Sequence, residues 1–455
     1  MKSISSDSLY NETKGRRTVM PWRKFIFSFM RLLPPIGCNL MDLLRGMLGR
    51  SSDYIALERQ LRVLLSTSVI MSFAGSLYGS LLGLYITNKL GVTILIFGLM
   101  NTVRDLISSL ASLPSGVLSD DFGRKNMMIS AIVLSISALV LLLLSKEYPL
   151  LFLALILQGV SSAFMGPSSS AYVIDVIPKE RRGKAYATLA FLQSLSSIIA
   201  TSLAGVVAVV FGFYWLFGMA LIFELIAMCG TTLYLKESLH HIGDKERGAS
   251  ESYNDKLRNG LVILKNPLLL AVLFGIVFHM LGLGIQGPYL AIYASDVLTF
   301  SLPSISLMLS AEQLGILIGH LPSGRIVDKY GGEISFAFHI IATSPSMILF
   351  TIAVNPVLAS VILFFWGLTF GLDNVSRQSL IAKYRTSAGI ATAYGVISLI
   401  SGIIALISPV IGGYIWTELT PQAVFYASAA VNVIGSLPLF MLWLYNRKQL
   451  PKTIG

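Results

Sequence analysis

The stretch GVLSDDFGRK, residues 116–125, lies between two long apolar runs and decides how they are joined. Gly116 lets two helix backbones approach closely, and Gly123 permits a tight left-handed turn. Asp120 supplies an acceptor side chain at the start of this turn. Arg124 and the lysine that follows it favour the cytoplasmic side of a membrane, where short basic loops are retained. The stretch therefore predicts a tight cytoplasmic turn between two membrane-spanning helices.

The composition is that of a membrane protein. Only 13% of the 455 residues are charged and 54% are hydrophobic, whereas soluble domains carry about 25% charged residues. Apolar stretches of about 20 residues, enough to cross a bilayer as α-helices, recur along the chain. The alternating short strands of a membrane β-barrel are absent from the sequence. We therefore predict an all-α integral membrane protein with twelve transmembrane helices. The predicted spans lie near residues 63–88, 94–118, 127–145, 149–176, 187–211, 214–235, 266–293, 303–326, 334–354, 357–382, 389–415 and 421–445.

The positive charge is distributed by side of the membrane. Of the 34 lysines and arginines, 30 lie in the termini or in the turns after even-numbered spans. The other turns hold only Lys89 and Lys146, and Arg104 and Arg377 fall within spans. The positive-inside rule then places both termini in the cytoplasm of a multi-pass protein of the cell membrane. The net charge of +11 is explained by this topology and does not indicate binding to nucleic acid.

A constant shift of 208 residues, the difference between Asp120 and Asp328, relates the two halves of the chain. The shift matches positions in several spans of the first half to counterparts in the second. It therefore predicts two pseudo-symmetric six-helix halves in parallel repeat. The matched pairs are Tyr85 and Tyr293, Arg104 and Glu312, Gly159 and Gly367, Tyr186 and Tyr394, and Gly205 and Gly413.

Segments outside the spans complete the predicted organisation. Residues 1–61 mix aromatic and basic side chains, which suits a helix on an anionic inner leaflet. The alternative is a regulatory or partner-binding segment. Residues 236–265 predict a solvated cytoplasmic linker, and residues 447–455 a cytoplasmic tail. The two six-helix halves occupy residues 62–235 and 266–446.

A partial copy of the opening stretch, GRIVDKYGG, occurs in the second half at residues 324–332. Gly324, Asp328 and Gly331 repeat the spacing of the two glycines and the aspartate in the first copy. Together the copies resemble the loop signature of the major facilitator superfamily of transporters. The resemblance implies a secondary transporter that works by alternating access, with its substrate site near the midplane between the halves and with no cofactor or metal.

The resemblance also implies roles for the loop residues. In the family, the aspartate corresponding to Asp120 lies against the start of span eleven, and the arginine corresponding to Arg124 pairs with an acid, here Asp175. This cluster is implied to stabilise the outward-facing state. The second copy departs from the pattern, because Gly332 and Glu333 replace the basic pair. The residues assigned to the gating motif are Gly116, Asp120, Gly123, Arg124, Lys125, Asp175, Gly324 and Asp328.

The pattern is closest to the drug/proton antiporter-like branch of the family. Span four carries the expected Gln158 and Gly159, but Leu155 stands where that branch has an arginine associated with proton coupling. Span eleven carries SPVIGG, residues 408–413, which suggests a gating bend or a packing kink with equal weight. The first expectation is therefore antiport or efflux, with the usual proton-coupling route in doubt.

Ionisable residues within spans are functional candidates because each is costly in hydrocarbon. Asp373 lies near mid-membrane in span ten with Arg377 one turn later, and is the best single candidate for coupling or substrate binding. A purely structural ion pair is the alternative. Arg104 and Glu312 occupy equivalent depths in the outer halves of spans two and eight. Asp105 is not expected to pair with Arg104, because adjacent helical side chains point about 100° apart.

The remaining candidates are weaker. Glu224 lies within span six, which the resemblance places outside the cavity, so packing against Asn432 or a protonated resting state is an equal alternative. His279 lies in span seven, and His339 is expected to be a core histidine. Polar residues also join helices without touching substrate. Further residues predicted to line a cavity are Tyr78, Gln158, Gln286 and Trp366.

Two functional hypotheses follow. The first is a secondary transporter that moves a small organic solute or drug, driven by protons through Asp373, Glu312 or Glu224. The second is a non-transporting receptor or sensor on the same fold, in which residues 1–61 carry the signal. Enzyme motifs such as HExxH, GxSxG and the P-loop are absent from the sequence. The expected partners are a small-molecule substrate, membrane lipids and protons.

Overall fold

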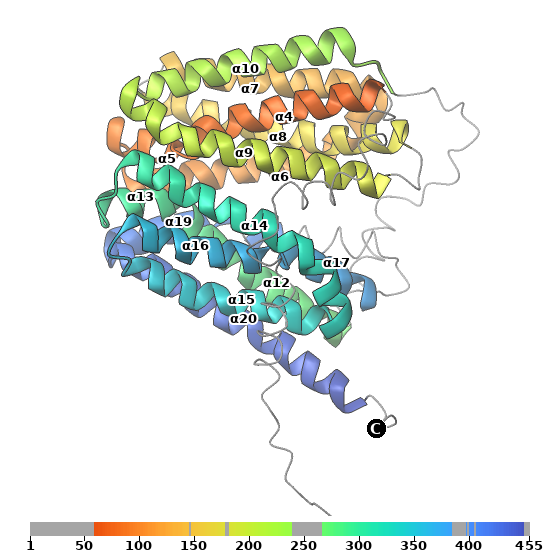
Figure 1. Ribbon diagram of the computed structural model, residues 1–455, viewed down its shortest axis with the longest axis vertical. Coiled ribbons are helices and arrows are strands. Elements are labelled where there is room, and N and C mark those ends of the chain that lie inside the picture. Colours follow the sequence, from red (N-terminus) through yellow and green to blue (C-terminus); the bar gives the residue numbers. More distant parts are fainter. Residues whose placement is uncertain are drawn as a thin grey trace, which may run out of the picture. The chain divides into compact units, whose positions relative to one another are not determined.

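The chain forms a bundle of membrane-length helices (Figure 1). The computed structural model describes residues 59–144, 147–177, 182–238, 266–384, 397, 400–404 and 406–449. Every regular element in these ranges is a helix. Nearly all of the predicted amino-terminal segment, most of the predicted linker, much of the predicted tail and the start of predicted span eleven lie outside the described residues.

Twelve helical segments of the described chain are long and apolar enough to cross a membrane, as the sequence predicts. The first six begin at Gln60 and end at Tyr234. Span one is interrupted, because its long helix is followed by a short helix and a π-helical turn. The elements are α4 (Arg59–Gly79), α5 (Leu82–Leu84), η1 (Tyr85–Lys89), α6 (Ile94–Phe122), α7 (Arg124–Leu144), α8 (Tyr148–Val176), α9 (Arg182–Val210) and α10 (Phe213–Tyr234).

The described part of the second set of six spans contains further interruptions, among them a turn at Ile407 in span eleven. Span seven passes through a 3-10 turn, and span ten breaks at Gly371. A single continuous helix is what hydropathy predicts for each, so the breaks are features that composition does not reveal. The elements are α12 (Pro267–Gln286), η4 (Gly287–Tyr289), α13 (Leu290–Asp296), α14 (Leu302–Tyr330), α15 (Gly332–Thr351), α16 (Pro356–Phe370), α17 (Asp373–Lys383), α19 (Ser408–Glu418) and α20 (Pro421–Gln449).

Local sequence signals start two of these helices. The Asn266 side chain accepts hydrogen bonds from the first backbone N–H groups of α12, and Asn355 does the same for α16. Pro267 and Pro356 follow at the first helical position, where the missing N–H costs nothing. The helix starts are therefore set by local chemistry as well as by hydropathy.

Helix packing reproduces the predicted 208-residue repeat. A side chain added at Gly159 on α8 would overlap the backbone carbonyl of Arg104 on α6. In the second half, a side chain added at Gly367 on α16 would overlap the backbone carbonyl of Glu312 on α14. All four positions are related by the same shift. Both close approaches depend on small residues, as is usual between helices in lipid.

Aromatic packing shows the same repeat. The rings of Tyr85 and Phe217 lie 4.8 Å apart at an interplanar angle of 69°. Their counterparts Tyr293 and Phe425 also lie 4.8 Å apart, at 67°. Edge-to-face geometry of this kind is the favourable one for aromatic pairs. The two halves are therefore equivalent in internal packing as well as in helix order.

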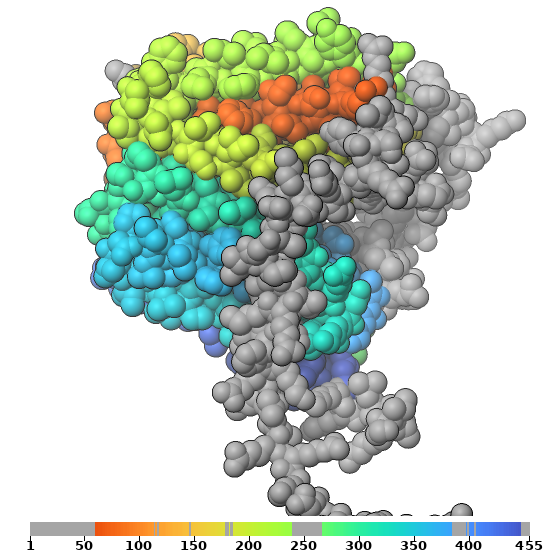
Figure 2. Space-filling model, viewed as in Figure 1, coloured from red at the N-terminus to blue at the C-terminus, as the bar shows by residue number. Residues whose placement is uncertain are grey.

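The halves meet along α9 and α14, which run side by side in Figures 1 and 2. Close to one end of the bundle, Gly205 on α9 abuts the backbone of Leu302, and Gly413 on α19 abuts that of Ile94. The 208-residue shift converts each contact into the other, because Gly205 corresponds to Gly413 and Ile94 corresponds to Leu302. At the same end, Asn88 Nδ2 donates a hydrogen bond to Asp296 Oδ1 at 2.6 Å. The halves are therefore in tight contact at the end opposite the loops that contain Gly123 and Gly331.

Candidate functional site

The loop between α6 and α7 is shorter than the sequence predicts. Helix α6 continues to Phe122, so Gly116 and Asp120 lie inside it, and Gly123 alone separates it from α7. Gly123 has φ of 96°, which a side chain would strain. Asp120 lies inside the helix and therefore does not open a turn. Its carboxylate instead pairs with Arg124, four residues later.

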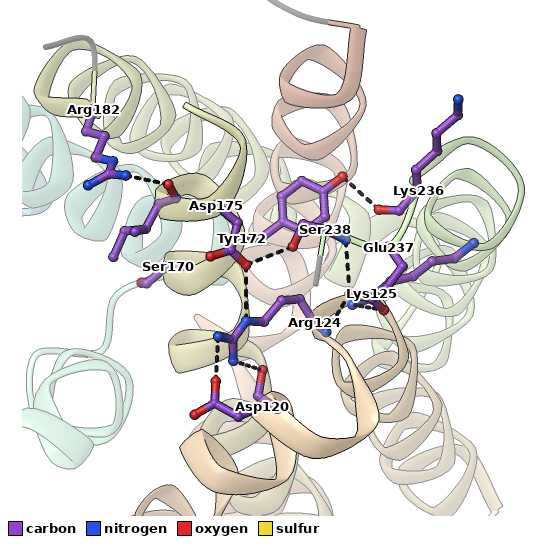
Figure 3. Close-up of polar contacts among 12 residues, drawn as sticks. Asp120, Arg124, Lys125, Ser170, Tyr172, Asp175, Arg182, Lys236, Glu237 and Ser238 are labelled. Carbon is purple, nitrogen blue, oxygen red and sulfur yellow. Dashed lines mark hydrogen bonds and ion pairs between the residues drawn. The ribbon is translucent and has the colours of Figure 1, made fainter. Parts of the chain in front are cut away.

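Arg124 joins three elements at this loop (Figure 3). Its Nη2 lies 2.5 Å from Asp120 Oδ1, and its Nε donates to Asp175 Oδ2 at the end of α8 at 3.3 Å. Its Nη1 also donates to Ser119 Oγ at 3.1 Å. The pairing with Asp175 that the resemblance implies is present. The start of span eleven, the implied neighbour of Asp120, lies outside the described residues.

Glu237, which follows α10, is a member of this cluster that the sequence reasoning missed. Its carboxylate accepts the backbone N–H groups of Arg124 at 2.8 Å and Lys125 at 3.1 Å (Figure 3). An acid at these first N–H groups stabilises the start of α7. Lys125 Nζ in turn donates to the carbonyl of Thr232 at 2.7 Å. The acidic residue close after the end of span six is the feature of the sequence that could have predicted this contact.

The second copy of the motif carries an ion pair of opposite polarity. Glu333 at the start of α15 is buried, and its Oε1 lies 2.5 Å from Nζ of Lys383 at the end of α17. Tyr384 Oη also donates to Glu333, as does Asn446 Nδ2 at 2.9 Å. Gly331 has φ of 87°, and Asp328 is exposed at the end of α14.

The 208-residue shift relates several members of the two clusters by position but not by charge or pairing, because Asp175 pairs with Arg124, the counterpart of Gly332, and not with Lys125. Glu333 corresponds to Lys125, Lys383 to Asp175, and Asn446 to Ser238, which donates to Asp175 at 3.0 Å. A basic loop residue facing an acid in the first half is thus replaced by an acid facing a lysine in the second. Gly324 lies within α14, and a side chain added there would meet nothing within 4 Å.

A cavity of about 490 Å³ lies between the two halves. Arg104 and Asp105 from α6 and Glu312 from α14 line it, together with the aromatic residues Phe97 and Trp366. The two positions that the repeat equates, Arg104 and Glu312, therefore share one cavity. Such a site between halves, mostly apolar with a few charges, is the usual form of a small-molecule site.

The expectation that Asp105 does not pair with Arg104 is wrong. Arg104 Nε donates to Asp105 Oδ1 at 2.9 Å, and both side chains are partly exposed to the cavity. Their Cβ atoms point apart, but the long arginine side chain curls back over the helix surface. Within the described residues Glu312 makes no ion pair, so it is the acid of the cavity that has no basic partner.

The other predicted polar residues lie elsewhere. Gln158 Nε2 donates to Tyr78 Oη at 3.0 Å, which joins α8 to α4. Gln286 is buried, and its amide has no hydrogen-bond partner among the described residues. None of these three is among the residues that line the 490 Å³ cavity.

The sequence left open that Glu224 packs against Asn432, but the structure gives the two residues different partners. Glu224 Oε1 accepts a hydrogen bond from Ser135 Oγ on α7 at 2.6 Å, inside the first half. Asn432 on α20 instead contacts His279 at 2.8 Å. The two residues belong to different halves, which explains the difference.

Asp373 is the first residue of α17, directly after the break in span ten. The predicted pair with Arg377 is present on one helix face. Asp373 is only 2% exposed and is not among the residues that line the 490 Å³ cavity. His279 from α12 and His339 from α15 lie beside it. The sequence reasoning considered these histidines singly and did not bring them together.

A model of the Major Facilitator Superfamily matches residues 64–280 and 272–455 of this chain. The chain therefore belongs to this superfamily, as its loop motifs predict. It is a multi-pass membrane protein and a secondary transporter of small molecules.

Named relatives agree with the drug/proton antiporter-like branch. The multi-drug resistance efflux pump PmrA of Streptococcus pneumoniae serotype 4 is 26% identical over 341 residues, which cover 73% of this chain and 82% of that protein. The multidrug resistance protein MdtG of Dickeya zeae is 25% identical over 396 residues, which cover 84% and 91%.

Solved structures agree in fold. The peptide transporter POT in complex with sulfate superposes with a TM-score of 0.67 at 16% identity, covering 85% of this chain and 94% of that one. The nucleoside transporter NupG also has a TM-score of 0.67, at 15% identity, with 84% and 99% coverage. At these identities the likeness concerns the fold alone.

Proposed function

We propose that this transporter exports lipophilic cationic small molecules across the cell membrane in exchange for protons. The names of the multidrug efflux relatives support the export of drugs. The observation that carries the proposal is the charge balance of the inter-half cavity. Arg104 is bound by Asp105, whereas Glu312 has no ion-pair partner within the described residues.

A carboxylate in this setting selects for positive charge. The cavity walls are largely apolar and include the aromatic residues Phe97 and Trp366, to which a flat cation would be attracted. A proton and a cationic substrate would compete for the same Glu312 carboxylate. Competition for one carboxylate is a sufficient physical basis for exchange, because occupation by either species removes the cost of a bare charge in the membrane.

We further propose that both termini and both motif loops are cytoplasmic, as the distribution of lysine and arginine indicates. With this orientation, the tight contacts of Gly205 and Gly413 and the bond from Asn88 to Asp296 lie at the outer end. The Arg124 cluster would then act at the inner end, where its partners must change as the cavity opens and closes. Lipids of the inner leaflet would contact the basic amino-terminal segment.

The test uses purified protein in proteoliposomes with an imposed proton gradient. Transport of tetraphenylphosphonium, a lipophilic cation, is measured for the wild type and for Glu312→Gln. We expect the gradient to drive accumulation in the wild type and the substitution to abolish gradient-driven accumulation, because the carboxylate for which proton and cation compete is gone. The matched control is Glu418→Gln, which removes an exposed acid at the end of α19, away from the cavity lining.

Two results would contradict the proposal. Wild-type accumulation by Glu312→Gln would remove the carboxylate from the mechanism. Accumulation by the wild type that does not respond to the proton gradient would exclude antiport, whatever the substrate.

A further inference from the structure

Three potential metal-ligand atoms converge inside the second half, outside the inter-half cavity. They are Nε2 of His279 on α12, Nε2 of His339 on α15 and a carboxylate oxygen of Asp373 on α17, all within 4.8 Å of one another. The two Nε2 atoms are 3.2 Å apart, and His279 Nε2 lies 3.8 Å from Asp373 Oδ1. Both histidines are fully buried and Asp373 is 2% exposed.

We propose that this cluster binds a divalent transition-metal ion, with zinc as the best fit. Four-coordinate zinc binds imidazole nitrogen at about 2.0–2.1 Å and carboxylate oxygen at about 2.0–2.2 Å, which sets neighbouring ligands roughly 3.3–3.5 Å apart. The separations of 3.2 and 3.8 Å lie on either side of that range. Two imidazoles and one carboxylate are a common catalytic-type ligand set, and they leave a fourth position for water.

Hydrogen bonds around the cluster hold the first imidazole in the form that a metal needs. Asn432 Nδ2 donates to the carbonyl of Ser428 at 2.9 Å, which leaves its Oδ1 as the acceptor for His279 Nδ1 at 2.8 Å. His279 Nδ1 therefore carries a hydrogen, and its Nε2 lone pair is directed toward the cluster. Metal-bound histidines usually have this kind of support on the other ring nitrogen.

The second imidazole is held by a hydroxyl group. His339 Nδ1 lies 3.3 Å from Thr369 Oγ1 at the end of α16. Thr369 Oγ1 donates its own hydrogen to the carbonyl of Trp366 at 2.8 Å, so it accepts from His339 Nδ1. In the neutral pair both Nε2 atoms therefore carry a lone pair, and they offer no donor to Asp373. Asp373 Oδ1 is buried and has no hydrogen-bond partner within the described residues. A metal ion would satisfy that oxygen and both nitrogens together.

Arg377 opposes metal binding, because it already pairs with the Asp373 carboxylate. Its guanidinium is bound to the other oxygen of Asp373, and a dication at the cluster would repel it. The Arg377 side chain is 23% exposed, so it can turn away from the cluster while the buried ligands stay in place. We therefore expect the metal and Arg377 to compete for the Asp373 carboxylate. Metal binding would break the ion pair between Asp373 and Arg377, which lie one turn apart on α17.

The test is a titration of the detergent-solubilised full-length chain with Co²⁺, carried out without a polyhistidine tag. The sequence holds five histidines, so the parent protein carries His240→Ala and His241→Ala to remove an adjacent histidine pair that would itself bind Co²⁺. Co²⁺ bound in a four-coordinate site gives a visible absorption band, and Zn²⁺ should displace it. We expect one equivalent to bind. His279→Gln and Asp373→Asn should each weaken binding at least as much as losing an outer-shell partner does, about 10–100-fold.

Two further variants make the result decisive. His320→Gln removes an exposed histidine of α14 that lies near Asp373 without belonging to the cluster, and it should change the affinity far less than His279→Gln does. Arg377→Gln should tighten binding by about 5–150-fold, the usual range of coupling between competing sites. This gain also tests the proposal if the histidine variants fail to fold.

The proposal is overturned if the parent protein binds no stoichiometric Co²⁺, since the contact between the imidazoles would then hold only a proton. It is equally overturned if His279→Gln binds Co²⁺ as the parent does, or if Arg377→Gln leaves the affinity unchanged. Transport by Glu312→Gln is independent of these outcomes, so failure here does not bear on the proposed function.

Discussion

The ion pair between Glu333 and Lys383 should contribute to stability through a measurable coupling. Glu333 Oε1 accepts from Lys383 Nζ at 2.5 Å while its side chain is only 3% exposed. Lys383→Gln leaves the buried carboxylate with its bonds from Tyr384 and Asn446 alone. Glu333→Gln removes the charge and lets Lys383 turn to solvent. The double variant Glu333→Gln/Lys383→Gln closes a thermodynamic cycle that isolates the pair.

The expected coupling free energy follows from the different exposure of the Glu333 and Lys383 side chains. A hydrogen bond to a charged group contributes about 1.5–3 kcal/mol when both partners are buried. The Lys383 side chain is 49% exposed, and water screens exposed pairs to about 0.2–1 kcal/mol. We therefore expect a coupling free energy of about 1–2 kcal/mol, between these limits. Each single variant should lower the apparent unfolding temperature by a few degrees.

The measurement is unfolding of purified protein in detergent, followed by intrinsic fluorescence for the wild type, the single variants and the double variant. Arg325→Gln, which removes an exposed cation of α14, serves as the matched control and should cost under about 0.5 kcal/mol. If the two single effects simply add to within about 0.3–0.5 kcal/mol, the pair has no coupling and the reasoning from its geometry fails.

Two other predictions concern the loops and the topology. Asp120→Asn should reduce transport at equal surface expression, because it weakens the 2.5 Å pair with Arg124; unchanged transport would make the loop a plain structural turn. Single cysteines at positions 15 and 250 of a variant lacking Cys38 and Cys229 should react with impermeant thiol reagents from the cytoplasmic side only. Labelling from outside would reverse the proposed orientation of every loop.

Hydropathy and charge were sufficient to predict the twelve spans, because a bilayer imposes one helix length on every crossing. The repeat register was equally accessible. The matched glycines Gly159 and Gly367 each lie against a backbone that the shift also equates, so the sequence pattern and the packing have one cause. The break at Gly371 was not predicted, since it depends on close approach to the backbone at Gly319 on another helix.

The partner of Glu333 could have been found from the sequence. Applying the 208-residue shift to Asp175 gives Lys383, so the loss of the basic loop pair in the second half has a compensating change of sign. The sequence reasoning treated Glu333 as a departure from the motif because it examined the loop alone. The pair of His279 and His339 offered no comparable signal, since residues 60 positions apart on different spans have no fixed relation in the sequence.

The Arg124 cluster and the Glu333 cluster differ in polarity and in exposure, which bears on which of the two loops changes its contacts during transport. The Asp120 side chain is 63% exposed, and among the described residues its one ion pair is with Arg124 four residues later, so its carboxylate can take a partner from the other half. Glu333 is 3% exposed and already accepts from three donors on α17, the residue after it and α20. Exchanging those donors would leave a buried charge unpaired, at a cost of about 3–5 kcal/mol. We infer that the first cluster is the one that changes partners during transport, while the second holds its half rigid.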